Sequence, residues 1–381
     1  MTSPVRQVRH DLGEKPFIAI WEVTRACQLV CAHCRADAQH EPAPGQLDTE
    51  QGKRLLEQLA GYPRPHPLVV LTGGDPFERG DLEELTAYGT ALGLNVSLSP
   101  SVTPRLTRER LASLREAGGS ALSLSLDGAS AATHDRFRGF GGTYDATMEV
   151  AEWVNEAGYR LQINSTITDE TVREAPELLQ HVIAMGAKLW SVFLLVPTGR
   201  GAGLKGLGPQ EKEDVMWWLA DVADRIAIKT TEAPMFRRVV LQKSRGIVYE
   251  GGELYSYLTR RTAELLGPNT APRRPRPPMA INAGSGFVFI DHVGDVYPNG
   301  FLPLKCGNVK DADVREIYSD SEVFRSLRDP SQWSGKCSVC EFAEVCGGSR
   351  STAYALTGDP LASDETCAWV PEGVATGAAR P

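Results

Sequence analysis

The chain lacks an excess of positive charge, because its 48 acidic residues outnumber its 40 basic residues and give a net charge of -8. A protein that binds nucleic acid through phosphate contacts needs a basic face, so this composition disfavours a nucleic-acid partner. The chain also lacks an apolar run that could span a membrane, and its first residues lack the apolar core of a signal peptide. We therefore expect a cytoplasmic protein with no membrane partner.

Cysteine is scarce as well, with eight residues in a chain of 381. Cys27, Cys31 and Cys34 fall within eight positions, and 271 residues separate this group from the next cysteine. The remaining cysteines lie in the last fifth of the chain: Cys306, Cys337, Cys340, Cys346 and Cys367. In a cytosolic protein, clustered thiols more often bind metal or act in catalysis than form disulfides. Two groups this far apart predict two separate sites.

Apolar strands and amphipathic helices alternate over the first half of the chain. We expect strands at 17–23, 67–76, 95–100, 121–128, 160–168 and 189–197, with helices at 48–62, 81–93, 107–118, 143–158 and 174–186 between them. The six strands are apolar on both faces, which is typical of a parallel α/β sheet or barrel.

The second half of the chain is less regular. Residues 208–265 predict mostly helix, and 286–302 predict a β-hairpin that turns at Gly294–Asp295. Between them, "GPNTAPRRPRPP" indicates a flexible loop or linker. A basic nucleic-acid patch is the alternative for this segment, but its few basic residues do not outweigh the acidic total.

The first cysteine group has the spacing Cys27-x3-Cys31-x2-Cys34 and follows the first expected strand directly. Loops at the C-terminal ends of parallel strands form the active sites of such folds. A structural zinc site needs four closed ligands, and no fourth cysteine is near. Three cysteine thiolates can instead hold a 4Fe–4S cluster with one iron open to an outside ligand. We expect such an open cluster here.

This motif, placed after the first strand of a βα-barrel, resembles the signature of radical S-adenosylmethionine (SAM) enzymes. The resemblance implies a partial (β/α)6 radical SAM barrel with a small cysteine-rich C-terminal Fe–S domain. It also implies that the open iron binds the amino and carboxylate groups of SAM. Electron transfer then cleaves SAM to a 5′-deoxyadenosyl radical, which abstracts a substrate hydrogen. A flavodoxin or ferredoxin would be the electron donor.

Other segments resemble the SAM-binding parts of this family. "TGGDP" looks like its Gly-Gly-Glu-Pro segment, with Asp75 in place of the longer Glu. "SLSPS" and "SLSLDG" resemble its ribose- and carboxylate-binding strands, and Asn164 on "QINSTIT" would be a further polar contact. Arg138 or its rival Arg136 would pair with the SAM carboxylate. His33 stands where the family has an aromatic residue near adenine. The expected SAM contacts are His33, Gly73, Gly74, Asp75, Pro76, Ser99, Ser125, Asp127, Arg138 and Asn164.

The second cysteine group has four members in the order Cys337-x2-Cys340-x5-Cys346 and then Cys367. Four thiolates in this order suit a closed site, for which zinc is one occupant. The arrangement resembles the SPASM extension of radical SAM enzymes, whose full form has seven cysteines and two auxiliary clusters. Asn299 and Arg350 stand where two of those cysteines would be. We therefore expect one auxiliary 4Fe–4S cluster, with Cys306 left as a free thiol or a ligand in a partial site.

These features divide the chain into five expected parts. The parts are an N-terminal segment (1–15), the radical SAM partial barrel (16–225), a helical connection and Pro/Arg-rich linker (226–280), a SPASM-like auxiliary cluster domain (281–370) and a tail (371–381).

The substrate class follows only from resemblance. "WEVTRACQLVCAHCRADA", "TGGDP" and "TTEAPMFRR" look like the SPASM-bearing enzymes that modify tetrapyrroles, including the branch of alternative-pathway haem synthases and haem d1 enzymes. Arg237 and Arg238 could then pair with propionates. The first alternative is a maturase of ribosomally made peptides, although only 26 residues precede Cys27 and many such enzymes carry a recognition domain there. The second is a non-catalytic Fe–S electron carrier, which would need neither the open iron nor "TGGDP".

Overall fold

The computed structural model describes residues 4–372, in which one twisted sheet of ten strands forms the centre of the molecule. The order across the sheet is β10-β9-β8-β1-β2-β3-β4-β5-β6-β7, and β1 to β7 pair in parallel. The strands are β1 (Ile18–Glu22), β2 (Leu68–Thr72), β3 (Asn95–Leu98), β4 (Ala121–Ser125), β5 (Arg160–Ile167), β6 (Leu189–Leu194), β7 (Ile228–Thr231), β8 (Phe287–Ile290), β9 (Asp295–Tyr297) and β10 (Gly307–Asn308).

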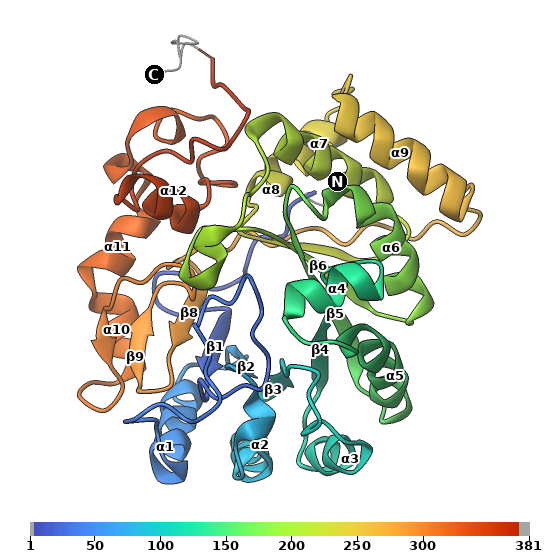
Figure 1. Ribbon diagram of the computed structural model, residues 1–381. Helices are drawn as coiled ribbons and strands as arrows, with labels where there is room; N and C mark the ends of the chain where they lie inside the picture. The colour runs from blue at the N-terminus through green and yellow to red at the C-terminus, as the bar shows by residue number, and fades with distance from the viewer. Residues whose placement is uncertain (1–3, 373–381) are drawn as a thin grey trace.

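Helices cover the outer side of this curved sheet, and a further group of helices lies beyond one of its edges. Figure 1 shows α1, α2, α3, α5 and α6 in an arc outside the strands, with α10 to α12 beside β8 and β9. The helices are α1 (Thr49–Ala60), α2 (Leu82–Ala91), α3 (Arg108–Glu116), α4 (Ala131–Arg138), α5 (Thr143–Glu156), α6 (Ala175–Ala184), α7 (Pro209–Val222), α8 (Met235–Ser244), α9 (Glu253–Leu266), α10 (Val314–Asp320), α11 (Glu322–Arg328) and α12 (Arg350–Thr357). None of the described helices is long and apolar enough to cross a membrane.

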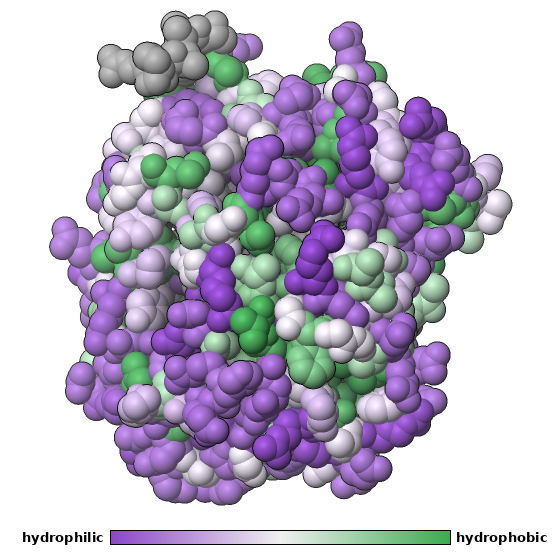
Figure 2. Space-filling model, in the orientation of Figure 1, coloured by the Kyte–Doolittle hydropathy of each residue, from purple (hydrophilic) through white to green (hydrophobic). Residues whose placement is uncertain are grey.

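The local sequence explains how these elements begin and which face they bury. In α1, the Asp48 side chain accepts from the Gln51 backbone N–H while the Gln51 side chain accepts from the Asp48 N–H, so the helix starts with a capping box. Its buried leucines pack into one apolar cluster with Trp21 and Trp190, both fully buried between sheet and helices. The face in Figure 1 has an apolar centre with hydrophilic residues around it (Figure 2).

The six expected strands and the α/β class are confirmed, and the linker at 267–278 contains no helix or strand. Residues 208–265 are mostly helical, as expected, but they also contain one strand, β7, that the sequence analysis did not predict. Its sequence "IKTT" is short and half polar, and only its pairing with β6 makes it a strand. The hairpin of β8 and β9 is confirmed, with Gly294 at φ +92°, a conformation that favours glycine. β8 also pairs in parallel with β1, so the hairpin continues the barrel sheet.

Candidate functional site

The loop after β1 carries Cys27, Cys31 and Cys34, and hydrogen bonds within the loop and from Arg200 fix its course. The Cys27 N–H donates to the Gln39 carbonyl at 2.7 Å, which closes the loop on itself. Arg200, after β6, donates to the carbonyl oxygens of Cys31 (from Nε, 2.9 Å) and Cys34 (from its backbone N–H, 3.1 Å). These contacts hold the three cysteines at the C-terminal ends of the strands, where the sequence predicted them.

The three thiols form one small cluster with Leu29 and Ala38, and each sulfur has a hydrogen-bond donor nearby. The Leu29 N–H lies 3.4 Å from Sγ of Cys27, and the Ala38 N–H lies 3.4 Å from Sγ of Cys34. N–H donors stabilise thiolate ligands and tune Fe–S clusters, so this donor set fits a cluster held by three cysteines. Among the described residues, no three Cys, His, Asp or Glu side chains converge tightly enough to hold a single metal ion.

Gly73 and Gly74 lie where the end of β2 meets this loop. The Gly74 N–H donates to the Thr24 carbonyl at 2.8 Å, and the Asp75 N–H donates to the Ala26 carbonyl at 2.7 Å. A Cβ atom on Gly73 would lie 2.3 Å from the Thr24 oxygen, and one on Gly74 would lie 2.4 Å from the Ala26 oxygen. The glycines therefore permit close approach to the cysteine loop, as well as to any ligand.

Asp75 is fully buried beneath that contact, at the start of a short turn with Pro76. Its carboxylate accepts hydrogen bonds from Thr103 Oγ1 at 2.7 Å and from the backbone N–H groups of Phe77 and Ser101. Burial raises the pKa of Asp75 to about 6. Three protein donors thus surround the carboxylate that the resemblance assigned to SAM, and Asp75 orders the turn beside Cys27, whose thiol lies 3.6 Å from Ser101 Oγ.

Ser99, Ser125 and Asn164 lie side by side at the same end of the sheet. Ser125 and Asn164 are register partners on β4 and β5. Ser99 follows β3, and its hydroxyl accepts from Ser123 Oγ at 2.9 Å. The structure therefore brings together the polar side chains that the sequence placed on three successive strands.

Arg138 and Asp127 form a buried ion pair next to the cysteine loop, with 3.0 Å between Arg138 Nη2 and Asp127 Oδ2. Arg138 also donates from Nη1 to Sγ of Cys31 at 3.5 Å. Burial alone would raise the pKa of Asp127, but the Arg138 guanidinium holds it below its usual range. The rival candidate, Arg136, is exposed and pairs with Glu170 at the surface. Of the two arginines, only Arg138 faces the cysteine loop.

His33 stacks on Phe137 at a centroid distance of 4.5 Å, and its Nδ1 is buried with no hydrogen-bond partner among the described residues. Burial lowers the pKa of His33 to about 4, so the ring is neutral near pH 7. A flat neutral ring with an unsatisfied nitrogen fits a site that takes a planar polar group such as adenine.

The sequence analysis missed a second buried charge network at the base of the loop. Glu22, the last residue of β1, accepts from Arg35 Nη2 at 2.8 Å and lies 3.2 Å from Nδ1 of His292 in the β8–β9 turn. Burial raises the pKa of Glu22, but Arg35 and His292 more than offset this and keep it below its usual range. The one sign of this network in the sequence is Glu22, a single carboxylate within the apolar run "FIAIWEV".

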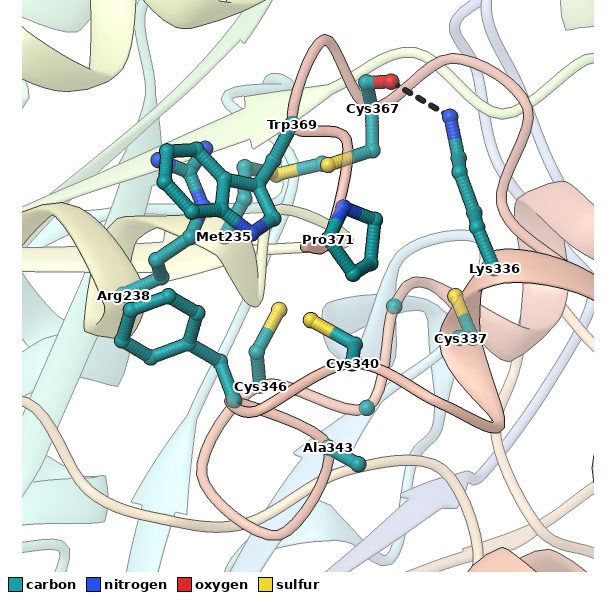
Figure 3. A pocket seen from close by; sticks show the side chains of 13 residues that line it. Met235, Arg238, Lys336, Cys337, Cys340, Ala343, Cys346, Cys367, Trp369 and Pro371 are labelled. Atoms are coloured by element: carbon teal, nitrogen blue, oxygen red, sulfur yellow. Dashed lines mark hydrogen bonds between the residues drawn. The ribbon is translucent and has the colours of Figure 1, made fainter. Parts of the chain in front are cut away.

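The C-terminal cysteines line one cavity (Figure 3). Cys337, Cys340, Cys346 and Cys367 come from two loops, and Lys336 ties these loops together by donating to the Cys367 carbonyl at 2.6 Å. Burial raises the pKa of Cys367 to about 11. Four thiols around one cavity are the donor set that a closed four-cysteine site needs.

The arginines of "TTEAPMFRR" lie beside this cavity and are already engaged. Arg238 forms a buried ion pair with Glu213 and lies over the Trp369 ring at 5.2 Å. Arg237 donates to the carbonyl oxygens of Met279 at 3.0 Å and Cys346 at 2.8 Å. Binding of propionates by these arginines stays a prediction, and Arg238 would have to leave its ion pair with Glu213 to meet it.

Cys306, Asn299 and Arg350 take no part in lining the cysteine cavity. The Cys306 thiol donates to the Leu304 carbonyl at 3.3 Å. Asn299 donates to Glu232 at 2.6 Å. Arg350 is fully buried, lies over the Trp333 ring at 4.7 Å and donates to the Ala362 carbonyl at 3.0 Å. The two residues that stand in cysteine positions therefore serve packing and hydrogen bonding.

Comparisons with known proteins agree with this geometry. Residues 21–182 match the family model described as "Radical SAM superfamily". The chain is 38% identical over 355 residues to "AdoMet-dependent heme synthase" of Oleidesulfovibrio alaskensis, covering 92% of this chain and 87% of that protein. It is 36% identical to the protein of the same name from Methanosarcina barkeri, covering 93% and 97%. The fold also resembles SuiB of Streptococcus suis bound to precursor peptide SuiA, with a TM-score of 0.67, 17% identity and coverage of 93% and 76%.

Replacing Gly74 by Ala should displace the cysteine loop, because the new Cβ would meet the Ala26 carbonyl. We expect a loss of roughly 1–3 kcal/mol in the free energy of unfolding, typical of overpacking, and less iron bound after reconstitution. Gly80→Ala is the matched control, since nothing lies within 4 Å of its Cβ position. Urea unfolding and iron analysis test this, and equal behaviour of the two variants would contradict it.

Arg138→Met should strand the Asp127 carboxylate in the interior and cost about 3–5 kcal/mol of stability near pH 7. The deficit should narrow as the pH falls, because burial raises the pKa of Asp127 once Arg138 is gone and protonation then removes the unpaired charge. Arg136→Met, on the same helix but exposed, should cost about 0–1 kcal/mol. Unfolding curves for both variants between pH 3 and 8 measure the difference in their free energies of unfolding. Similar losses in the two variants would refute the role of Arg138 as the buried partner of Asp127.

Changing Cys337 and Cys340 together to Ser should lower the iron content of reconstituted protein from about eight to about four per chain, if the C-terminal cavity holds a four-iron cluster. Cys306→Ser should leave the iron content unchanged. The measurement is combined iron and zinc analysis. One zinc lost with no change in iron would show a zinc site instead, and about twelve irons in the wild type would imply a further cluster.

Proposed function

The chain belongs to the radical SAM superfamily, and we propose that it removes or oxidises a propionate side chain of a tetrapyrrole. As a radical SAM enzyme it uses SAM and a 4Fe–4S cluster. The observation that carries the proposal is the 38% identity to a protein named "AdoMet-dependent heme synthase", which extends over 92% of this chain.

The residues of the first site have separate roles in this proposal. Cys27, Cys31 and Cys34 would hold the cluster, which when bound supplies the electron that cleaves SAM to a 5′-deoxyadenosyl radical. Arg138 places a positive charge beside the ligand Cys31 and keeps Asp127 ionised. His33 offers a neutral ring for adenine, and Ser99, Ser125 and Asn164 offer polar groups for the rest of SAM.

The C-terminal cavity would hold one auxiliary 4Fe–4S cluster through Cys337, Cys340, Cys346 and Cys367. Burial raises the pKa of Cys346, and the nearby guanidinium groups of Arg237 and Arg238 oppose this rise, which supports a thiolate ligand at this position. We further propose that the chain divides into the parts 1–15, 16–225, 226–280, 281–370 and 371–381. The electron donor would be a protein of the flavodoxin or ferredoxin type. Tight binding of zinc is the alternative for this cavity.

The test is turnover of iron-coproporphyrin III by reconstituted protein with SAM and a chemical reductant. We expect a Soret shift on binding, 5′-deoxyadenosine formation that rises with the tetrapyrrole, and a product that has lost carboxyl groups by mass spectrometry. The methyl ester of the same tetrapyrrole is the matched control, because it lacks free carboxylates and should not be converted.

Two results would defeat this proposal. An unchanged Soret band, together with SAM cleavage stimulated by a peptide encoded beside the protein, would favour a peptide maturase. Assembled clusters with no SAM cleavage under any condition would favour an electron carrier.

A further inference from the structure

A second cavity begins at the N-terminal ends of several strands, away from the cysteine loop, and extends along β7 to Glu232, Ala233 and Pro234, which follow that strand. Its empty volume of about 1050 Å³ includes space open to solvent, and its walls include the first residues of five strands. These residues are Ile18 of β1, Leu68 of β2, Leu189 of β6, Ile228 of β7 and Phe287 of β8. The walls are therefore largely apolar, and the cavity is wide enough for a small organic molecule.

Positive charge faces this cavity without a matching carboxylate. Lys229 of β7 lines it, and no described residue accepts a hydrogen bond from its ammonium group. Burial, with a smaller effect of Arg276, lowers the pKa of Lys229 to about 8. Arg276 lines the cavity at its exposed edge, and the charged groups around it are Arg6, Arg160 and Arg273, all positive.

The other charged residues of the lining do not neutralise Lys229 and Arg276. Arg237 is 5% exposed, adds a third positive charge, and its Nε is buried with no partner among the described residues. Glu232 is the carboxylate of the described lining, and its oxygens already accept from Asn299 Nδ2 and Ser349 Oγ, each at 2.6 Å. An uncompensated cation in an apolar cavity is unfavourable unless an anion joins it.

We propose that this cavity binds an apolar molecule through a carboxylate, which the Lys229 ammonium and the Arg276 guanidinium hold, at a site separate from the cysteine loop. Both groups donate charge-assisted hydrogen bonds to carboxylates, and the apolar walls receive the rest of the ligand. The carboxylate has two possible sources: a propionate arm of a tetrapyrrole, or an independent carboxylic acid. Gln162 lines the cavity and donates to Asn164 Oδ1 at 2.7 Å, so the cavity and the expected SAM contacts share strand β5.

Calorimetric titration of the reconstituted protein with octanoate and octanamide tests the proposal, because the two probes have the same shape and differ in charge. We expect octanoate to bind about tenfold or more tightly than octanamide. Lys229→Met should weaken octanoate binding by a similar factor and leave octanamide unaffected. Arg276→Gln, a change in an exposed loop that leaves the core intact, should also weaken octanoate binding. Lys205→Met is the matched control, since Lys205 is exposed and pairs with Asp169.

Equal affinity for the two probes in the wild type would overturn the proposal, and so would unchanged octanoate affinity in both variants. Competition then distinguishes the sources. Displacement of octanoate by iron-coproporphyrin III, but not by its methyl ester, identifies a propionate arm. Octanoate binding that persists with the tetrapyrrole bound identifies an independent carboxylic acid. Octanoate binding needs no turnover, so this proposal can stand or fall independently of the proposed function.

Discussion

The mouth of the barrel depends on one balanced charge, the buried pair of Arg138 and Asp127. As the proposed cluster ligands, the thiolates of Cys27, Cys31 and Cys34 would bring negative charge into a site where the Asp75 and Asp127 carboxylates are already buried, and such charges are costly without a partner. The Arg138 guanidinium pairs with Asp127 through Nη2 and donates to the Cys31 sulfur through Nη1. The loops after β1 and β4 can approach each other because this guanidinium lies between them.

Much of this arrangement follows from the sequence. The strand and helix pattern predicted the parallel sheet, and the spacing of Cys27, Cys31 and Cys34 after the first strand predicted where they would lie. Contacts between distant segments could not be predicted in the same way. β7 is a strand only because β6 pairs with it, and the Glu22, Arg35 and His292 network joins residues 270 positions apart. Local propensity carries no information about such pairs.

Buried polar residues attach the C-terminal region to the barrel. Asn299 and Arg350 stand where the resemblance would place two cysteines, and both are buried with hydrogen-bond partners. Asn299 bonds to Glu232 after β7, and Ser349 bonds to the same carboxylate. These contacts attach the region of α12 to the barrel, next to the cavity that four cysteines line.

The central claim is that the cysteine loop after β1 is the site of SAM cleavage, and one variant tests it most directly. Replacing Cys27, Cys31 and Cys34 together by Ala should leave a folded, still brown protein that holds about four irons in its C-terminal cavity and forms no 5′-deoxyadenosine. Undiminished 5′-deoxyadenosine formation by this triple variant would contradict the account.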